Sequence, residues 1–141
     1  MIIWISQRLA LAIHDRQLAE HCGSAGVRDQ SLLDSALARP QQLFSYGDPP
    51  PDIAALAASL AFGLARNHPF VDGNKRTAHV CYRVFLALND AELVATDEDK
   101  YIAMLRLAEG SITEAEFADW LRPRLVLSTA DSVNEPAAAY R

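Results

Sequence analysis

The chain has 141 residues, of which 50% are hydrophobic and 22% are charged, and its formal net charge is −5. A chain of this length suits one domain with its own core, and the composition excludes intrinsic disorder of the whole chain. Two cysteines are too few for a disulfide framework, and the net negative charge argues against a protein that coats nucleic acid. The start of the chain lacks a signal-peptide pattern and no apolar run is long enough for a bilayer. We therefore expect a soluble cytoplasmic protein with no membrane contact and no direct DNA binding.

Apolar residues recur at helical spacing along most of the chain and predict an all-α fold. In chain order, we expect helices over residues 5–21, 29–38, 53–65 and 74–89, one between Thr96 and Gly110, and one after Thr113. Asp52 and Thr96 are expected N-caps, and Thr113 with Glu116 forms a capping-box pattern. The helix over residues 74–89 is apolar most of the way round, which predicts a central, largely buried helix.

Three other segments do not read as helix. Residues 39–48 combine proline, glycine and aromatic residues, and we expect them to form a short flap loop. Residues 92–95 carry the best strand signal. The chain from residue 128 is polar and rich in alanine, so we expect one domain over residues 1–127 and a flexible tail over residues 128–141.

One segment of eleven residues, 67–77, concentrates groups suited to chemistry on phosphates. His68 can take a proton from a hydroxyl near neutral pH, and Asp72 is a hard oxygen ligand suited to Mg²⁺. Gly73 lets the backbone approach a ligand closely, and the N-terminus of the following helix offers free N–H groups to an anion.

The charge around this segment also favours an anionic ligand. Lys75 and Arg76 stand in the first turn of the expected helix, where cations oppose the helix dipole and a bound phosphate removes the conflict. Between Arg66 and Arg83 the chain has four cations and one anion, a basic spot on an acidic protein. Such a spot favours a small polyanion over a long nucleic acid. Spacing of i, i+3 and i+7 gives Arg76, His79 and Arg83 one helix face that could line the site.

These residues also have a purely structural interpretation. Asp72, Gly73 and Asn74 could form only a tight turn with a helix cap, and a lone histidine such as His68 is more often structural than catalytic. Phe70 is expected to anchor the core under either interpretation. His14 and His21 are expected to pack or to face solvent, and together with Cys22 they make a poor metal-ligand set. The functional interpretation gains weight because all its features fall within eleven residues.

The segment resembles the signature of the Fic/Doc family, His-x-Phe-x-Asp/Glu-Gly/Ala-Asn-Gly/Lys-Arg, in the stretch His68-Pro69-Phe70-Val71-Asp72-Gly73-Asn74-Lys75-Arg76. Lys75, where the larger Fic branch has glycine, resembles the Doc (death-on-curing) branch. The resemblance covers about residues 3–124, with matching stretches at residues 14–29, 32–40, 85–89 and 120–122.

This resemblance implies a helical bundle around the motif helix and a toxin of a toxin–antitoxin pair. The Doc prototype uses ATP to phosphorylate a threonine of elongation factor Tu and stops translation. Carried over to this chain, His68 is the general base, Asp72 holds Mg²⁺, and residues 39–48 correspond to a flap that aligns the target segment. Four residues are expected to cradle the nucleotide phosphates: Gly73, Asn74, Lys75 and Arg76.

Two departures from the wider family stand out. His79 takes the place of a second arginine of the AMP-transferring branch, and together with Lys75 it favours an inverted nucleotide and transfer of the γ-phosphate. Cys22 stands where such toxins often have glycine, and Asp90 stands at a glycine-like turn position. Both are local loop changes, and we expect little effect on the chemistry.

Self-inhibited Fic proteins carry the pattern Ser/Thr-x-x-x-Glu-Gly/Asn. Here the one glutamate followed by glycine or asparagine is Glu109, and Leu105 stands four residues before it. The pattern is therefore absent, which implies a Phd-like antitoxin that acts in trans through a partly disordered segment.

Three other interpretations stay open. The same site could transfer AMP to a protein hydroxyl, or the chain could be a catalytically silent helical binding partner. A small metal-dependent hydrolase using His68 and Asp72 is the third, and the shortage of further carboxylates near the motif argues against a two-metal site.

Overall fold

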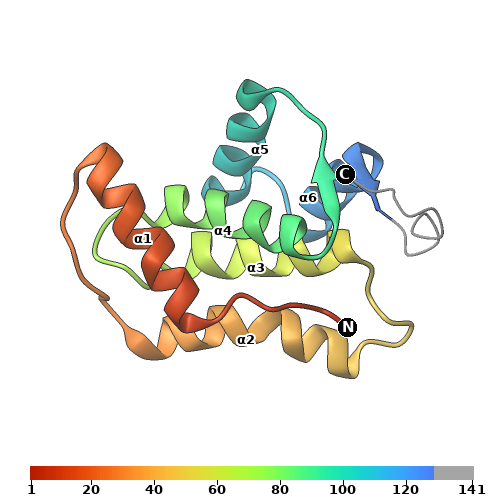
Figure 1. The fold of residues 1–141 in the computed structure, drawn as a ribbon, viewed down its shortest axis with the longest axis horizontal. Coiled ribbons are helices and arrows are strands. Elements are labelled where there is room, and N and C mark those ends of the chain that lie inside the picture. The colour runs from red at the N-terminus through yellow and green to blue at the C-terminus, as the bar shows by residue number, and fades with distance from the viewer. Residues whose placement is uncertain (129–141) are drawn as a thin grey trace.

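The computed structural model describes residues 1–128, which form six α-helices, a 3₁₀ turn and a two-stranded sheet (Figure 1). The helices are α1 (Gln7–His21), α2 (Gln30–Tyr46), α3 (Ile53–Asn67), α4 (Asn74–Leu88), α5 (Asp97–Glu109) and α6 (Glu114–Leu121), followed by the turn η1 (Arg122–Arg124). The strands are β1 (Ala91–Leu93) and β2 (Leu125–Leu127). The predicted all-α fold is confirmed. The predicted tail covers residues 128–141, and all of these except residue 128 lie outside the described residues.

The sequence signals for helix starts hold in the structure. Asp52 accepts a hydrogen bond from the backbone N–H of Ala55, and Thr96 accepts one from the N–H of Asp99. Thr113 and Glu116 make both bonds of the capping box. Each bond satisfies a backbone donor that a helix N-terminus leaves without a partner.

The core is centred on α3, of which ten of fifteen residues are buried. The helix predicted over residues 74–89 is α4, which buries six of its fifteen residues, so it is buried on one face and not most of the way round. In Figure 1, α2, α3 and α4 lie side by side, α1 crosses them, α5 stands over α4, and α6 packs against α3. Small residues allow this close packing: a Cβ on Gly63 of α3 would lie 3.1 Å from the Cα of Ala36 in α2. The largest side chains that are fully buried include Tyr82, Phe70, Phe85 and Phe117. Among the helices of residues 1–128, none has the length and apolar character needed to cross a bilayer.

The predicted flap over residues 39–48 is wrong. Residues 39–46 continue α2, and Pro40 lies buried inside that helix. A proline inside a helix removes one backbone hydrogen bond, but Pro40 completes the buried stripe that begins with Leu33, Ala36 and Leu37 and packs against α3. Burial of this stripe offsets the lost bond, so the helix runs on to Tyr46.

The sheet joins two distant parts of the chain. Strand β1 spans residues 91–93 rather than the predicted 92–95, and it pairs antiparallel with β2, which the sequence did not indicate. The start of the chain is tied down beside it, because the Asn89 side chain accepts from the N–H of Ile3 and donates to the Ile3 carbonyl.

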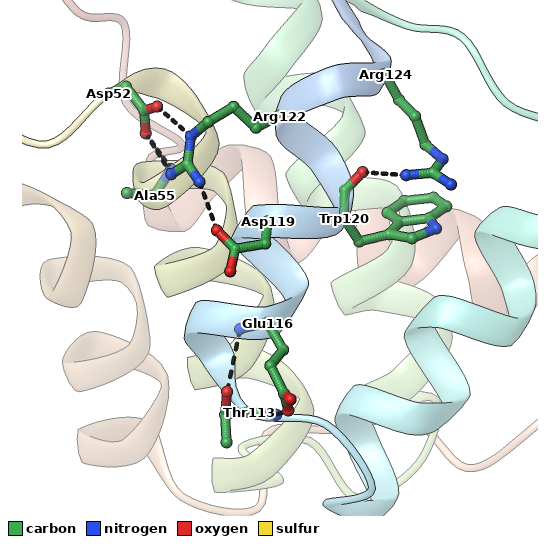
Figure 2. A network of polar contacts seen from close by, with 8 residues as sticks. All are labelled: Asp52, Ala55, Thr113, Glu116, Asp119, Trp120, Arg122 and Arg124. Atoms are coloured by element: carbon green, nitrogen blue, oxygen red, sulfur yellow. Dashed lines mark hydrogen bonds and ion pairs between the residues drawn. The ribbon is translucent and has the colours of Figure 1, made fainter.

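A polar network fixes the end of α6 to the start of α3 (Figure 2). The guanidinium of Arg122 donates to both carboxylate oxygens of Asp52, at 2.6 and 3.1 Å, and to Asp119 at 2.7 Å. Arg124 donates to the Trp120 carbonyl and lies over the Trp120 ring, 4.8 Å from its centroid. This end of α3 is opposite the end that carries the motif.

Candidate functional site

All six residues predicted for the site line one pocket of about 490 Å³. They are His68, Asp72, Gly73, Asn74, Lys75 and Arg76. This volume lies in the range of pockets that hold small molecules and cofactors, roughly 300–1,000 Å³. No residue of the segment 39–48 is part of the lining.

His68 occupies the junction where α3 ends. Its backbone is left-handed, with φ 51° and ψ 56°, and its exposed side chain lines the pocket. Arg28 secures this junction: its guanidinium donates to the carbonyls of His68 at 2.8 Å and of Asn67 at 3.0 Å. The end of α3 is therefore fixed in place while the imidazole of His68 faces the pocket.

The loop after His68 is held by the segment that precedes α2. The N–H groups of Arg28 and Asp29 donate to the Pro69 carbonyl at 2.7 and 3.1 Å, and the Val71 N–H donates to Gly26 at 3.0 Å. Phe70 is 1% exposed, which confirms its predicted role as a core anchor.

Asn74 braces the same loop from the other side. Its Oδ1 accepts from the Phe70 N–H at 2.9 Å, and its Nδ2 donates to the Phe70 carbonyl at 3.0 Å. The side-chain amide is thus occupied within the protein, and the group that Asn74 can offer to a ligand is its backbone N–H.

The N-terminus of α4 differs from those of the other described helices. Each of the other five α-helices has a side chain that caps its N-terminus, whereas α4 begins after Gly73, with φ 78° and no side-chain cap. The backbone N–H groups of its first turn are therefore available to an anion. Lys75 and Arg76 are exposed beside them, and within residues 1–128 neither pairs with a carboxylate. This arrangement favours a bound phosphate group.

Asp72 supplies the carboxylate of the pocket. Its Oδ1 accepts from the Gly73 N–H at 2.9 Å and its Oδ2 from the Ser24 N–H at 3.2 Å. The group is exposed, and each oxygen keeps a lone pair for another ligand. Mg²⁺ keeps several waters and takes one or two carboxylates besides substrate phosphates, so the donor set fits such an ion. Within residues 1–128, no group of three or more His, Cys, Asp or Glu side chains forms a metal cage.

The helix face predicted to line the site divides in two. Arg76 and His79 line the pocket, while Arg83 donates to the His79 carbonyl at 3.1 Å and borders a separate hollow with Lys100. Burial lowers the pKa of His79 to about 4, and the nearby cations Arg83 and Lys100 add to the effect. His79 is therefore neutral at pH 7.

The sequence interpretation missed the second wall of the pocket. Tyr101, Met104 and Leu105 of α5 form it. Their spacing of i, i+3 and i+4 shows that they share a helix face, but no local signal says which part of the fold that face meets. His14 is 2% exposed, which agrees with the expectation that it packs or faces solvent, but its contact with the motif from α1 was not predicted. His21 and Cys22 are exposed.

Fold and site together define a mainly helical protein with a pocket at the start of α4 that is suited to an anion. Residues 4–86 match the model of the Fic/DOC family, and the chain belongs to that family. It is 48% identical over 73 residues to "Toxin Doc" of Mycolicibacterium smegmatis, an alignment that covers 52% of this chain and 56% of that protein. It is 30% identical over 120 residues to "Protein kinase doc" of Escherichia phage P1, covering 84% of this chain and 92% of that protein. The resemblance to Doc-type toxins is confirmed.

Proposed function

We propose that this chain is a Doc-like toxin that transfers the γ-phosphate of ATP to a serine or threonine hydroxyl of a translation protein similar to elongation factor Tu. One observation carries the proposal. A single pocket combines an exposed histidine, an exposed carboxylate and an uncapped helix N-terminus flanked by two cations. The names of the two relatives, a toxin and a protein kinase, support it.

His68 acts as the general base in this proposal. The target hydroxyl gives its proton to the imidazole while its oxygen bonds to the γ-phosphorus, and the bond from that phosphorus to the bridging oxygen of ADP breaks. The exposed ring at the rim of the pocket can meet a hydroxyl on another protein. Arg28 holds the backbone of His68 in place. The imidazole therefore keeps the orientation that proton transfer requires.

The start of α4 holds the phosphates. The backbone N–H groups of Asn74, Lys75 and Arg76 point along the helix axis, and the side chains of Lys75 and Arg76 add positive charge. Asp72 would hold Mg²⁺, which supplies positive charge to the transferring phosphoryl group when it is bound.

Two residues favour phosphate transfer over AMP transfer. Lys75 adds bulk and charge where the AMP-transferring branch has glycine. His79 is neutral in the folded protein, whereas that branch places an arginine there. Among the residues of α4 that line the pocket, Lys75 and Arg76 are therefore the two with a positive charge. This distribution favours a nucleotide whose terminal phosphate lies at the helix start.

The proposal includes a cytoplasmic site of action and a Phd-like antitoxin that acts in trans. Leu105 occupies the position where a self-inhibited relative has serine or threonine, so control by a separate partner is expected. Co-expression of a cognate antitoxin should restore growth that the toxin alone arrests. Growth arrest that persists with the antitoxin present contradicts this part of the proposal.

Intact mass spectrometry tests the reaction directly. Elongation factor Tu is incubated with the protein, ATP and Mg²⁺, and a His68→Ala variant runs alongside. We expect a phosphate-sized mass gain with the wild type and a rate about 10²–10⁴-fold lower with the variant. An AMP-sized gain would assign the chain to AMP transfer. No gain with either protein would refute elongation factor Tu as the target, and labelling of a whole lysate would then test for another.

A further inference from the structure

His14 contacts the loop between α3 and α4, which contains Asp72, although the two residues are 58 positions apart in the chain. Its ring is 2% exposed and stacks on the ring of Phe70, with a centroid distance of 3.8 Å and an interplanar angle of 8°. Helix α1 therefore contacts the motif through an aromatic stack, which fixes the plane of the imidazole.

The same ring makes a hydrogen bond to the metal-ligand candidate. His14 Nε2 lies 2.8 Å from the backbone oxygen of Asp72. A carbonyl oxygen only accepts, so the proton of this bond resides on Nε2. A Cβ on Gly73 would lie 3.7 Å from the same nitrogen, so the imidazole edge supports the peptide that joins Asp72 to Gly73.

Asp72 is thus held at two points by one part of the chain. His14 in α1 binds its backbone oxygen, and Ser24, just after α1, donates to its carboxylate Oδ2 at 3.2 Å. Rotation of the peptide between residues 72 and 73 would move the carboxylate and the N-cap of α4 together. The two contacts oppose that rotation.

Packing alone does not explain a histidine at this position. A phenylalanine or leucine would fill a buried site against Phe70 without a polar group to satisfy, whereas a buried imidazole needs a hydrogen bond. The only bond of the His14 side chain within residues 1–128 goes to Asp72. The residue type is therefore explained by that bond.

We infer that His14 is a positioning residue, which fixes the Asp72 peptide so that the carboxylate and the phosphate-binding N-terminus of α4 keep their relative placement. Its effect on activity rests on the proposed function. Residues that orient a metal ligand through a hydrogen bond change metal affinity or activity by about 10–100-fold when they are replaced.

Two variants separate the stack from the hydrogen bond. His14→Phe keeps an aromatic ring on Phe70 and removes the donor. His14→Gln places a donor nitrogen near the position of Nε2 and removes the ring. His21→Phe is the matched control, because His21 is an exposed histidine of the same helix. Thermal melting establishes that each variant is folded before the comparison.

The first measurement is the Mg²⁺ concentration at which a non-hydrolysable ATP analogue binds half-maximally. We expect an increase of about tenfold for His14→Phe, recovery of most of that loss in His14→Gln, and no change in His21→Phe. Wild-type behaviour of His14→Phe, or equal impairment of both His14 variants, would overturn the inference, because the ring would then act only by packing.

The second measurement does not depend on any ligand. Amide hydrogen exchange at Gly73 and Ser24 reports whether Asp72 keeps its two hydrogen bonds. We expect faster exchange at both amides in His14→Phe and near wild-type exchange in His14→Gln. If wild-type protein fails to bind the analogue, the proposed function fails. The exchange rates still decide the role of His14, because unchanged exchange in His14→Phe refutes it.

Discussion

Asn74 and Phe70 are joined by two hydrogen bonds that close a ring between one side chain and one peptide backbone. Oδ1 of Asn74 accepts from the Phe70 N–H at 2.9 Å, and Nδ2 donates to the Phe70 carbonyl at 3.0 Å. The Phe70 ring is buried, so this pair links the core to the first turn of α4. The motif asparagine therefore shapes the pocket through the backbone.

Replacing Asn74 by alanine should destabilise the fold as well as the site. The change leaves both backbone groups of Phe70 without their partner, and we expect a loss of about 2–3 kcal/mol in the free energy of unfolding. Asn67→Ala is the control, because Asn67 donates one side-chain bond, to the Leu32 carbonyl at 3.2 Å. It should cost about 0.5–1.5 kcal/mol. Urea unfolding measures both, and equal losses would contradict the bracing role of Asn74.

Much of the fold could be predicted because its signals are local. Asp52, Thr96 and the Thr113–Glu116 box each satisfy a helix N-terminus within three residues, so the spacing alone identifies them. The continuation of α2 through Pro40 could not be predicted in this way. It depends on packing against α3, where Gly63 admits Ala36. Strand β2 depends on a partner more than thirty residues away.

In the candidate site, too, the residues close together in the chain could be predicted and those that meet only through the tertiary fold could not. His68, Asp72 and the start of α4 lie within nine residues, so their grouping in one pocket could be predicted from sequence. Ser24 and His14 reach Asp72 from the α1 region, and Tyr101 closes the pocket from α5. Only the tertiary fold brings these residues together, and no periodic pattern in the sequence indicates that they are in contact.

Gly23 should matter for the position of Asp72. A Cβ there would lie 2.8 Å from Oδ2 of Asp72, and φ is +135°. Gly23→Ala should therefore displace the carboxylate and raise the Mg²⁺ concentration needed for nucleotide binding by about tenfold, while strain lowers stability by roughly 1–3 kcal/mol. Titration of Mg²⁺ with the non-hydrolysable ATP analogue measures the first effect.

Gly26→Ala is the matched control for Gly23→Ala. Gly26 has φ +116°, and its nearest contact would be a methyl group of Val71 at 3.6 Å. The same type of backbone strain applies there without a clash at Asp72, so stability should fall and the Mg²⁺ dependence should stay that of the wild type. Equal shifts of the Mg²⁺ dependence in both variants would show that strain, and not the contact with Asp72, is responsible.

Replacing Cys22 by glycine should stabilise the folded protein. Cys22 ends α1 with φ 65° and ψ 171°, a conformation that glycine adopts readily and other residues adopt at a cost of about 1–3 kcal/mol. Cys22→Gly removes that strain, and the larger entropy of the unfolded chain offsets part of the gain, so we expect a net gain of about 1 kcal/mol. Cys22→Ala keeps the strain and should show no gain. Chemical denaturation compares the two, and equal stability would argue against strain at this position.

His79 should make the stability of the protein depend on pH. Burial, assisted by Arg83 and Lys100, lowers its pKa to about 4 in the folded state, whereas an unfolded histidine has a pKa of about 6.5. The unfolded state therefore binds the proton first as the pH falls. The stability due to neutral His79 is complete above about pH 6.5 and is lost as the pH decreases toward 4.

A His79→Gln variant isolates this contribution. Since His79 is partly exposed, we expect the wild type to lose about 1–2 kcal/mol more than the variant between pH 7.5 and 4.5, after allowance for screening by solvent. His21→Gln removes an exposed histidine and should keep the pH dependence of the wild type. Urea unfolding at a series of pH values gives the three curves. If the wild type and His79→Gln lose stability in parallel, the fold does not hold His79 in its neutral form.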